Sequence, residues 1–173
     1  MTTPATNKQV PDQSIMDKFN KQIYLGNSFV VSESLSLGTT AEFNLFLIRN
    51  PNVSSFQLSK SLFIQLSRFA SSAQSALIQT YISPVVSTVG TPLVPVNLRP
   101  ANPNTSVAQV YSNGQFTLSS RGTLMFSLGV GGTNASSLDG LMTIIDQGFD
   151  LLITGEAVTA STLLSSTLSW YEI

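Results

Sequence analysis

From residue 27 onward, apolar and polar side chains alternate along the chain instead of recurring every three or four positions. In the stretch "SFVVSESLSLG", Phe29, Val31 and Leu35 belong to one face, whereas Ser32 and Ser34 belong to the other. A period of two is that of a β-strand with one buried face, because successive side chains of a strand point to opposite sides. This pattern restricts most of the chain to β-structure.

The same alternation returns in short segments separated by turn-forming residues. Residues 56–69 also fit a helix through Leu62, Leu66 and Phe69, but their β-branched and serine-rich neighbours favour a strand. Residues 141–156 are interpreted as a hairpin around Asp146–Gly148. The other strand candidates lie within residues 42–51, 71–84, 106–113, 115–132 and 163–173.

The spacing of these segments predicts an all-β protein. About eight or nine short strands, with turn signals every ~8–12 residues, are typical of sandwiches and barrels. About eight strands joined by long connections favour one architecture in particular, the jelly roll. We therefore predict a single jelly-roll-like antiparallel β-sandwich over residues 27–173.

A proline-rich connection interrupts the strand pattern at residues 90–106, "GTPLVPVNLRPANPNTS". Proline has no N–H to donate, so it is excluded from central strands. We expect this segment to cross between the two sheets or to form a sheet edge. Its prolines, Pro92, Pro95, Pro100 and Pro103, would stiffen it, and a stiff exposed crossing can serve as a contact surface.

Residues 1–26 differ from the rest of the chain and are predicted to form an N-terminal arm. Ile15, Phe19 and Ile23 recur every four residues and would share one side of a short helix that Ser14 caps. We expect an extended or short-helical arm. It would either anchor the protein through this apolar side or remain flexible as a frayed terminus.

The composition excludes several classes of partner. Charged residues make up 10% of the 173 residues and the net charge is -1, against about 25% charged residues in an ordinary soluble domain. Such a surface has no general attraction for phosphate backbones, so we expect no nucleic acid. The chain has no run of about 18 apolar residues, so we expect no membrane span. Its N-terminus also lacks the apolar core of a secretory signal.

The chain contains no histidine and no cysteine. Their absence removes Ser-His-Asp and Cys-His catalysis, disulfides, and imidazole or thiolate metal sites. We therefore predict that the protein is not an enzyme. No catalytic, cofactor-binding or metal-binding residue is predicted, and no cofactor is expected.

The best candidates for a chemical site are three aspartates, Asp139, Asp146 and Asp150. Their spacing matches no EF-hand loop, and Asp146 and Asp150 suit hairpin decoration better than a glycosidase pair. The segment "GVGGTN", residues 129–134, lacks the lysine and the following Ser/Thr of a phosphate-binding loop and is predicted to form a turn.

Two further features suggest carbohydrate. Asn104 and Asn134 begin glycosylation sequons, which mean little without an export signal. Trp170 and Tyr171 would form a sugar-binding platform if both were exposed. Trp170 falls in step with Leu164 and Leu168, however, which predicts a core position for it.

Charges of opposite sign are separated along the chain. Between Glu42 and Asp139 there are only basic charges, at Arg49, Lys60, Arg68, Arg99 and Arg121, and after Asp139 there are only acidic ones, at Asp146, Asp150, Glu156 and Glu172. One explanation is that these sparse charges fall in this order by chance. Alternatively, the acidic C-terminal strands lie beside the basic middle of the chain, within a subunit or across an interface.

Self-association is predicted from the apolar content of 42% combined with so few charges. Two strand candidates, "EFNLFLIRN" and "TLMFSLGV", have apolar residues on both faces. In the first, Phe46 and Ile48 point away from Phe43, Leu45 and Leu47, so one set needs cover outside a two-layer core. We expect a homo-oligomer, with a trimer favoured, and these strands are the candidates for its interface.

The later half of the chain resembles small β-sandwich proteins of tailed-bacteriophage virions, of the head-fibre or capsid-decoration type. The resemblance rests on "YISPVVSTVGTPLVPVNLRPANPNTS", "DQGFDLLIT" and the closing "SWYEI", and covers roughly residues 78–173. That family carries a "TGGTPLTPVNLN"-like segment, a "PGxxLLI"-like hairpin and a final aromatic-acidic strand. This chain departs from the hairpin motif at Gln147, where proline would stand.

The resemblance implies a non-enzymatic virion structural protein that decorates or projects from a bacteriophage capsid, commonly as a homotrimer. It would be made in the host cytoplasm and would attach to capsid or other virion proteins through residues 1–26. One alternative is a carbohydrate- or receptor-binding module of a phage fibre, with a host-surface glycan as its partner. A second alternative is a jelly-roll coat protein.

Overall fold

The computed structural model describes residues 27–37, 40–52, 60–71, 76–98, 105–130, 142–158 and 162–172. All regular secondary structure in these ranges is β-strand, so the all-β prediction is confirmed, and residues 56–69 contribute a strand from Leu62 onward. The predicted arm, residues 1–26, lies outside the described residues. The strands are β1 (Asn27–Leu37), β2 (Phe43–Arg49), β3 (Leu62–Ser71), β4 (Ala76–Ile82), β5 (Val85–Val89), β6 (Val96–Asn97), β7 (Gln109–Ser112), β8 (Phe116–Ser120), β9 (Thr123–Val130), β10 (Met142–Ile145), β11 (Asp150–Ala157) and β12 (Thr162–Glu172).

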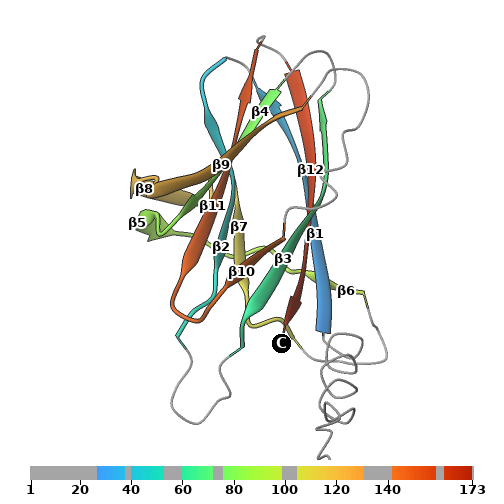
Figure 1. Cartoon of the computed structure of the whole chain (residues 1–173), viewed down its shortest axis with the longest axis vertical. Coiled ribbons are helices and arrows are strands. Elements are labelled where there is room, and N and C mark those ends of the chain that lie inside the picture. The colour runs from blue at the N-terminus through green and yellow to red at the C-terminus, as the bar shows by residue number, and fades with distance from the viewer. Residues whose placement is uncertain are drawn as a thin grey trace, which may run out of the picture.

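Ten of these strands form two five-stranded antiparallel sheets that face each other, and β5 and β8 form a separate two-stranded sheet (Figure 1). Sheet A has the order β10-β3-β12-β1-β6, and sheet B has the order β7-β2-β11-β4-β9. Within them β1 pairs with β12, β2 with β11, β3 with β10 and β4 with β9, as nested hairpins do. Wrapping these nested pairs around a common core produces a jelly roll. The predicted jelly-roll sandwich is therefore confirmed.

An excursion between β4 and β9 contains the proline-rich connection. β6 adds to sheet A beside β1, and β7 adds to sheet B beside β2, so the two described parts of the connection, which end at Leu98 and resume at Thr105, lead to the edges of different sheets. Pro95 directly precedes β6, an edge strand where a missing N–H is tolerated. Both alternatives expected for this connection, a crossing between the sheets and a sheet edge, therefore apply to it.

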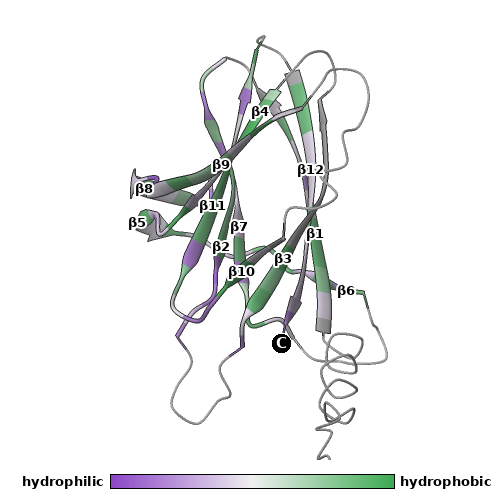
Figure 2. Cartoon of the chain, in the orientation of Figure 1, coloured by the Kyte–Doolittle hydropathy of each residue, from purple (hydrophilic) through white to green (hydrophobic). Residues whose placement is uncertain are grey.

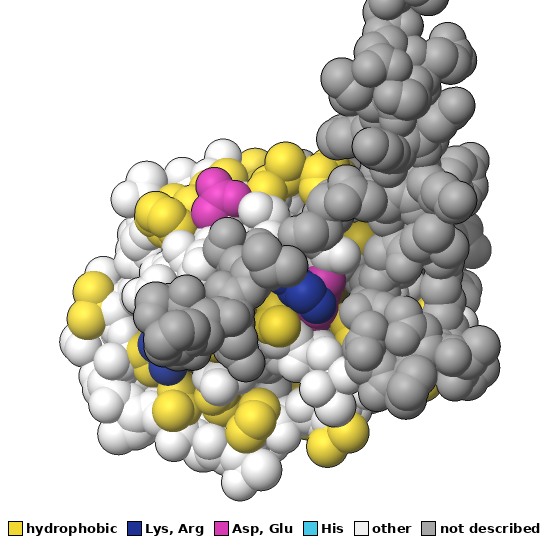
Figure 3. Space-filling model, turned by 90° about the horizontal axis from the view of Figure 1, so that it is seen from below, with side chains coloured by type: hydrophobic (Ala, Val, Ile, Leu, Met, Phe, Trp, Pro, Cys, Tyr) yellow, Lys and Arg dark blue, Asp and Glu magenta, His cyan; other side chains and the backbone are white. Residues whose placement is uncertain are grey.

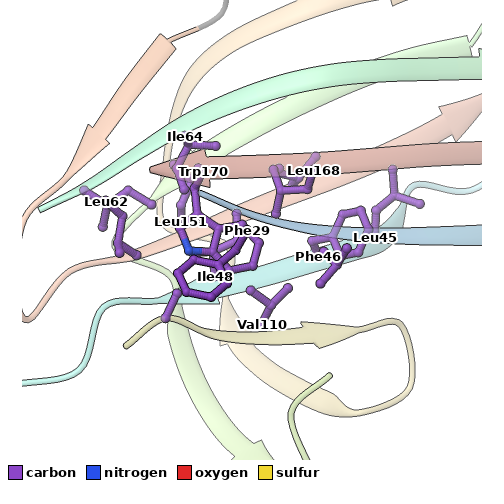
Figure 4. Packing of buried hydrophobic residues seen from close by; sticks show 14 of the residues in the cluster. Phe29, Leu45, Phe46, Ile48, Leu62, Ile64, Val110, Leu151, Leu168 and Trp170 are labelled. Atoms are coloured by element: carbon purple, nitrogen blue, oxygen red, sulfur yellow. The ribbon is translucent and has the colours of Figure 1, made fainter. Parts of the chain in front are cut away.

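The main core lies between the two sheets (Figure 4). Phe29 of β1 stacks on Trp170 of β12 at a ring-centroid distance of 5.8 Å. These two rings face Ile48 and Leu151, which come from sheet B. Figure 2 shows how apolar and polar residues alternate along the strands that enclose this core.

A second, smaller core lies on the outer face of sheet B. Leu47, Tyr111 and Leu152 are buried there with Phe116, and Val86 and Leu118 pack against them. The covering residues come from the two-stranded sheet of β5 and β8, which projects from the sandwich in Figure 1. This small sheet supplies, within one chain, the cover that the two apolar faces of β2 require.

The alternation predicted for β2 is wrong at its centre because of a β-bulge. The register between β2 and β11 shifts between Ile153 and Thr154, so that Phe46 pairs with Ile153 but Asn44 pairs with Thr154. The extra residue, Leu45, therefore enters the main core beside Phe46. A bulge of this kind exchanges the faces of all residues beyond it.

The turn at Asp146–Gly148 is present, but the predicted hairpin is wrong. Phe149 N–H donates to Asp146 O at 3.2 Å, and Gly148 adopts the positive φ that glycine tolerates. The flanking strands do not pair, because β10 belongs to sheet A and β11 to sheet B. Asn50, which is buried, fixes this sheet-to-sheet turn by donating to Lys60 O and Ile145 O at 2.7 and 2.9 Å.

Candidate functional site: the crossing and its surroundings

The aspartates considered as a metal or acid–base site have separate structural partners. Asp146 accepts a hydrogen bond from Ser61 at 2.8 Å, and Asp150 accepts one from Arg49 at 3.0 Å. Asp139 lies outside the described residues. Within the part of the chain that the structure describes, no group of three or more acidic, histidine or cysteine side chains could hold a metal ion.

The pKa of Asp150 predicts a specific pH dependence. Burial raises this pKa above the ordinary value of 3.8, and the Arg49 guanidinium only partly opposes the effect. The folded protein therefore binds the proton more tightly than the unfolded chain, and the contribution of Asp150 to stability increases as the pH falls through the folded-state pKa. Urea unfolding from about pH 6 to about pH 3 should show the parent gaining stability relative to Asp150→Asn. A constant or shrinking difference would contradict this.

The supposed sugar platform at Trp170–Tyr171 does not form. Trp170 is fully buried, which confirms its predicted core position, and Tyr171 lies half-buried on the opposite face of β12. Ser106 of the first sequon is half-buried, whereas Asn104 and the second sequon lie outside the described residues. Of the segment 129–134, only Gly129 and Val130 are described, and they end β9.

Glu172 anchors the end of the crossing to sheet A. Its carboxylate is buried and accepts hydrogen bonds from Ser106 Oγ at 2.6 Å, the Val107 N–H at 2.8 Å and Lys60 Nζ at 3.2 Å. Trp170 Nε1 donates to Ser106 Oγ at 3.2 Å. The closing strand β12 and the end of the crossing at Ser106 and Val107 are therefore parts of one contact.

Removing the Glu172 carboxylate should loosen this end of the crossing. We expect Glu172→Ala to lower the free energy of unfolding by about 1–3 kcal/mol, because the Val107 N–H and Ser106 hydroxyl lose a buried acceptor. Glu172→Gln keeps an acceptor oxygen and should lose less. Denaturant unfolding of both variants tests this, and equal losses would show that charge, not hydrogen bonding, is decisive.

Two hollows flank the crossing at the edge of the sandwich. The smaller, of about 310 Å³, is lined by Val30, Val31, Ser32, Leu93, Val94 and Val96. The larger, of about 500 Å³, lies between the two limbs of the crossing over Phe29, and includes Pro92, Pro95, Thr105 and Gln109. Leu93 and Val94 line both hollows, and the Leu93 N–H donates to Val110 O at 2.7 Å, which holds the crossing against β7.

The outer side of the crossing is apolar and exposed. Val94, Val96 and Leu98 alternate with residues that face the protein, and Val94 is 90% exposed. Rigid attachment on both sides of these residues presents them as a contact surface without a charged group among them. We call Val94, Val96 and Leu98 the crossing ridge. In Figure 3 the described surface at this end of the molecule is likewise mostly uncharged.

The charge separation along the sequence is partly explained by pairing within the subunit. Arg49 pairs with Asp150 at 3.0 Å and Lys60 pairs with Glu172 at 3.2 Å, which agrees with the second of the two explanations considered, that the basic middle of the chain lies beside the acidic C-terminal strands. Arg121 instead pairs with Glu42, at 2.7 Å. These pairs hold loops and strand ends to one another.

A polar cluster around Glu42 was not predicted. Glu42 accepts hydrogen bonds from Thr154 and Tyr81 and pairs with Arg121. Burial raises the pKa of Tyr81, and its hydrogen bond to Glu42 adds to this effect. The cluster ties Arg121, which follows β8, to sheet B. Its members are far apart in the sequence, so no local pattern could have found it.

The two strands expected to line an oligomer interface, β2 and β9, lie in different environments. Phe46, Leu47 and Ile48 of β2 are fully buried within the chain, so the prediction that β2 lines an interface is wrong. Leu124 and Met125 of β9 are about half exposed, at 47% and 46%. β9 therefore remains a candidate for contact with another molecule.

No protein-family model, curated protein or solved structure was found to match this chain. Among the described residues, no helix is long and apolar enough to span a membrane.

Proposed function

We propose that the chain is a non-enzymatic virion structural protein that decorates or projects from a bacteriophage capsid. The main structural support is a jelly roll whose crossing ridge is exposed, uncharged and apolar. Jelly rolls serve as viral capsid domains and as lectins. Because a fold alone does not specify a function, the sequence resemblance over residues 78–173 provides the second line of support.

The proposed assembly is a homo-oligomer, with a trimer favoured, attached to the capsid through residues 1–26. β9 is the candidate for the trimer contact, since Leu124 and Met125 expose apolar surface on a strand with no charged residue. Desolvating such a strand costs no ion-pair or charge-burial energy. On this proposal the protein is found in the virion after synthesis in the host cytoplasm.

Deletion of residues 1–26 tests the attachment. We expect the shortened protein to keep its β-rich circular dichroism and its unfolding midpoint, because the jelly-roll pairs lie within residues 27–172. We also expect it to be absent from purified particles in which mass spectrometry detects the full chain. A full chain that is absent from virions would refute the assignment. A deleted form that still attaches would refute only the anchoring role.

Two alternative functions are also proposed, and each predicts a different experimental result. A coat protein of the same fold would assemble into closed shells by itself, which electron microscopy of the purified protein would show. A receptor-binding module would bind host-surface glycans, and the larger hollow, with Thr105, Asn97 and Gln109 beside Pro92 and Pro95, is where such a ligand would fit. Glycan-array binding that is lost in Gln109→Ala would favour this module over passive decoration.

A further inference from the structure

The unpaired edge of a strand is a template for pairing with a strand of another molecule. Most edge strands of this fold are protected against such pairing. The edge strands β10 and β7 are short, at 4 residues each. β9 is long but is interrupted by a register shift, because Tyr81 pairs with Leu124 whereas Thr80 pairs with Phe126, which leaves Met125 as a bulge. The two-stranded sheet of β5 and β8 is irregular as well, with two register shifts. Short edges and bulges are the usual devices against edge-to-edge association.

The edge of β1 lacks such protection. β6 covers only Phe29 and Val30 of β1, and the chain before β6 turns away toward β7, where the Leu93 N–H donates to Val110 O. Beyond Val30, β1 continues to Leu37 with unbroken register against β12 on its other side. This stretch has no lysine, proline or bulge at its edge. Its single charged residue, Glu33, alternates with the outward serines, so that it would stand opposite Leu35 and not opposite another charge in a pairing centred on Ser34.

The hydrogen-bonding groups on this edge follow from the antiparallel ladder. Ser28 O accepts from the Leu98 N–H, so the backbone of Ser28 faces the β6 side of β1. Backbone groups of successive residues face alternate sides in an antiparallel strand. Ser32, Ser34 and Ser36 therefore present both N–H and C=O to the open edge. Their backbone groups have no partner among the described residues, and all three residues are exposed.

The serine side chains leave this edge unobstructed. Ser32 Oγ bonds to Thr167 Oγ1 and Ser34 Oγ bonds to Ser165 Oγ, each at 3.1 Å, so both hydroxyls lean toward β12 and away from the edge. The side chains are small and uncharged, so a like residue placed opposite would neither clash nor repel.

We propose that this edge pairs with the same edge of a second copy, antiparallel, across a twofold axis through Ser34. The three outward residues are evenly spaced, so Ser34 meets Ser34 of the copy while Ser32 meets Ser36. In any other register fewer of the three serines would be paired, because the backbone groups of Val30 already pair with those of Val96. The contact is self-complementary, because the open edge of each copy pairs with that of the other. It joins sheet A of the two copies into one continuous sheet.

The surface beside the edge accommodates this partner strand. The smaller hollow lies next to Ser32, with Val31, Leu93 and Val94 among its lining residues. The part of the second strand that runs past Ser32 would enter this hollow. Val94, the most exposed apolar residue of the ridge, would then lose contact with water. Sheet pairing and apolar burial therefore favour the same arrangement.

Cysteine cross-linking tests the register directly, because the chain contains no cysteine. Directly opposed residues of a hydrogen-bonded pair have Cα atoms about 5.5 Å apart, within disulfide range. Ser34→Cys should therefore oxidise to a covalent dimer of the full-length protein. Ser32→Cys, in the matched position two residues away, should not cross-link to itself, but it should cross-link to Ser36→Cys when the two are mixed. Equal cross-linking of Ser34→Cys and Ser32→Cys would overturn the proposal.

Solution mass distinguishes this contact from the proposed trimer. β1 and β9 lie at opposite edges of the sandwich, so a twofold contact at β1 and a threefold contact at β9 are independent. We expect the parent to contain an even number of chains by sedimentation and Ser34→Pro, which lacks the edge N–H, to have half that mass. Ser34→Ala, which loses only the hydroxyl, should match the parent. Ser34→Lys provides a second edge variant if the proline variant misfolds. A parent of three chains would overturn the twofold contact and leave the trimer standing, and a single chain would overturn both.

Discussion

Replacing Phe46 by Asp is expected to prevent folding of the protein. Phe46 is fully buried at the centre of the main core, where the β2 bulge places it beside Leu45. Truncating a buried phenylalanine costs about 3–5 kcal/mol, and a buried unpaired carboxylate adds several more. The sum is comparable to the whole stability of a domain, about 5–15 kcal/mol. Circular dichroism and a urea titration should show an unfolded or insoluble chain.

Leu124→Asp is the matched control, since it places the same charge on the other strand with two apolar faces. Leu124 is 47% exposed, so its replacement should preserve the fold and the unfolding midpoint within about 1 kcal/mol. If β9 forms the trimer contact, this variant should also lose that contact in sedimentation. A soluble, folded Phe46→Asp protein would show that β2 is not a core strand.

Replacing Trp170 by Ala should produce the second large effect, a loss of about 3–5 kcal/mol in the free energy of unfolding. Trp170 is fully buried, stacks on Phe29 and hydrogen-bonds to Ser106, so its loss opens a cavity and weakens the anchor of the crossing. Denaturant unfolding of the parent and the variant measures the difference.

Tyr171→Ala is the control for Trp170→Ala, because Tyr171 is the adjacent residue on the outer face of β12. It should cost much less, since a half-buried side chain leaves no closed cavity. If the two variants lost equal stability, the assignment of Trp170 to the core would be wrong.

Local pattern was sufficient to predict the strands and most of their buried faces. Phe29 and Val31 on β1, and Leu164, Leu168 and Trp170 on β12, are buried as their alternation predicts. Each of these assignments depends only on neighbours within a strand, where side chains must point to opposite sides. The many short strands and the long crossing were also sufficient to favour a jelly roll.

The candidate contact surface was predicted only in outline. The prolines of residues 90–106 indicated an exposed crossing, which the structure contains, but its exposed side, Val94, Val96 and Leu98, depends on how β6 pairs with β1. The anchor at Glu172 was not predictable, because Ser106, Lys60 and Glu172 are brought together by three different elements.

By itself, the sequence determined the strand class, the buried faces of regular strands and the absence of imidazole and thiol chemistry, since these depend on composition and on neighbouring residues. Only the tertiary structure decided three other features. These are the bulge at Leu45, the passage from β10 to β11 between sheets, and the cover that the two-stranded sheet of β5 and β8 gives to Leu47. The physical reason is that a turn or an alternating strand does not specify its partner. The partner is chosen by the burial available when all strands pack together.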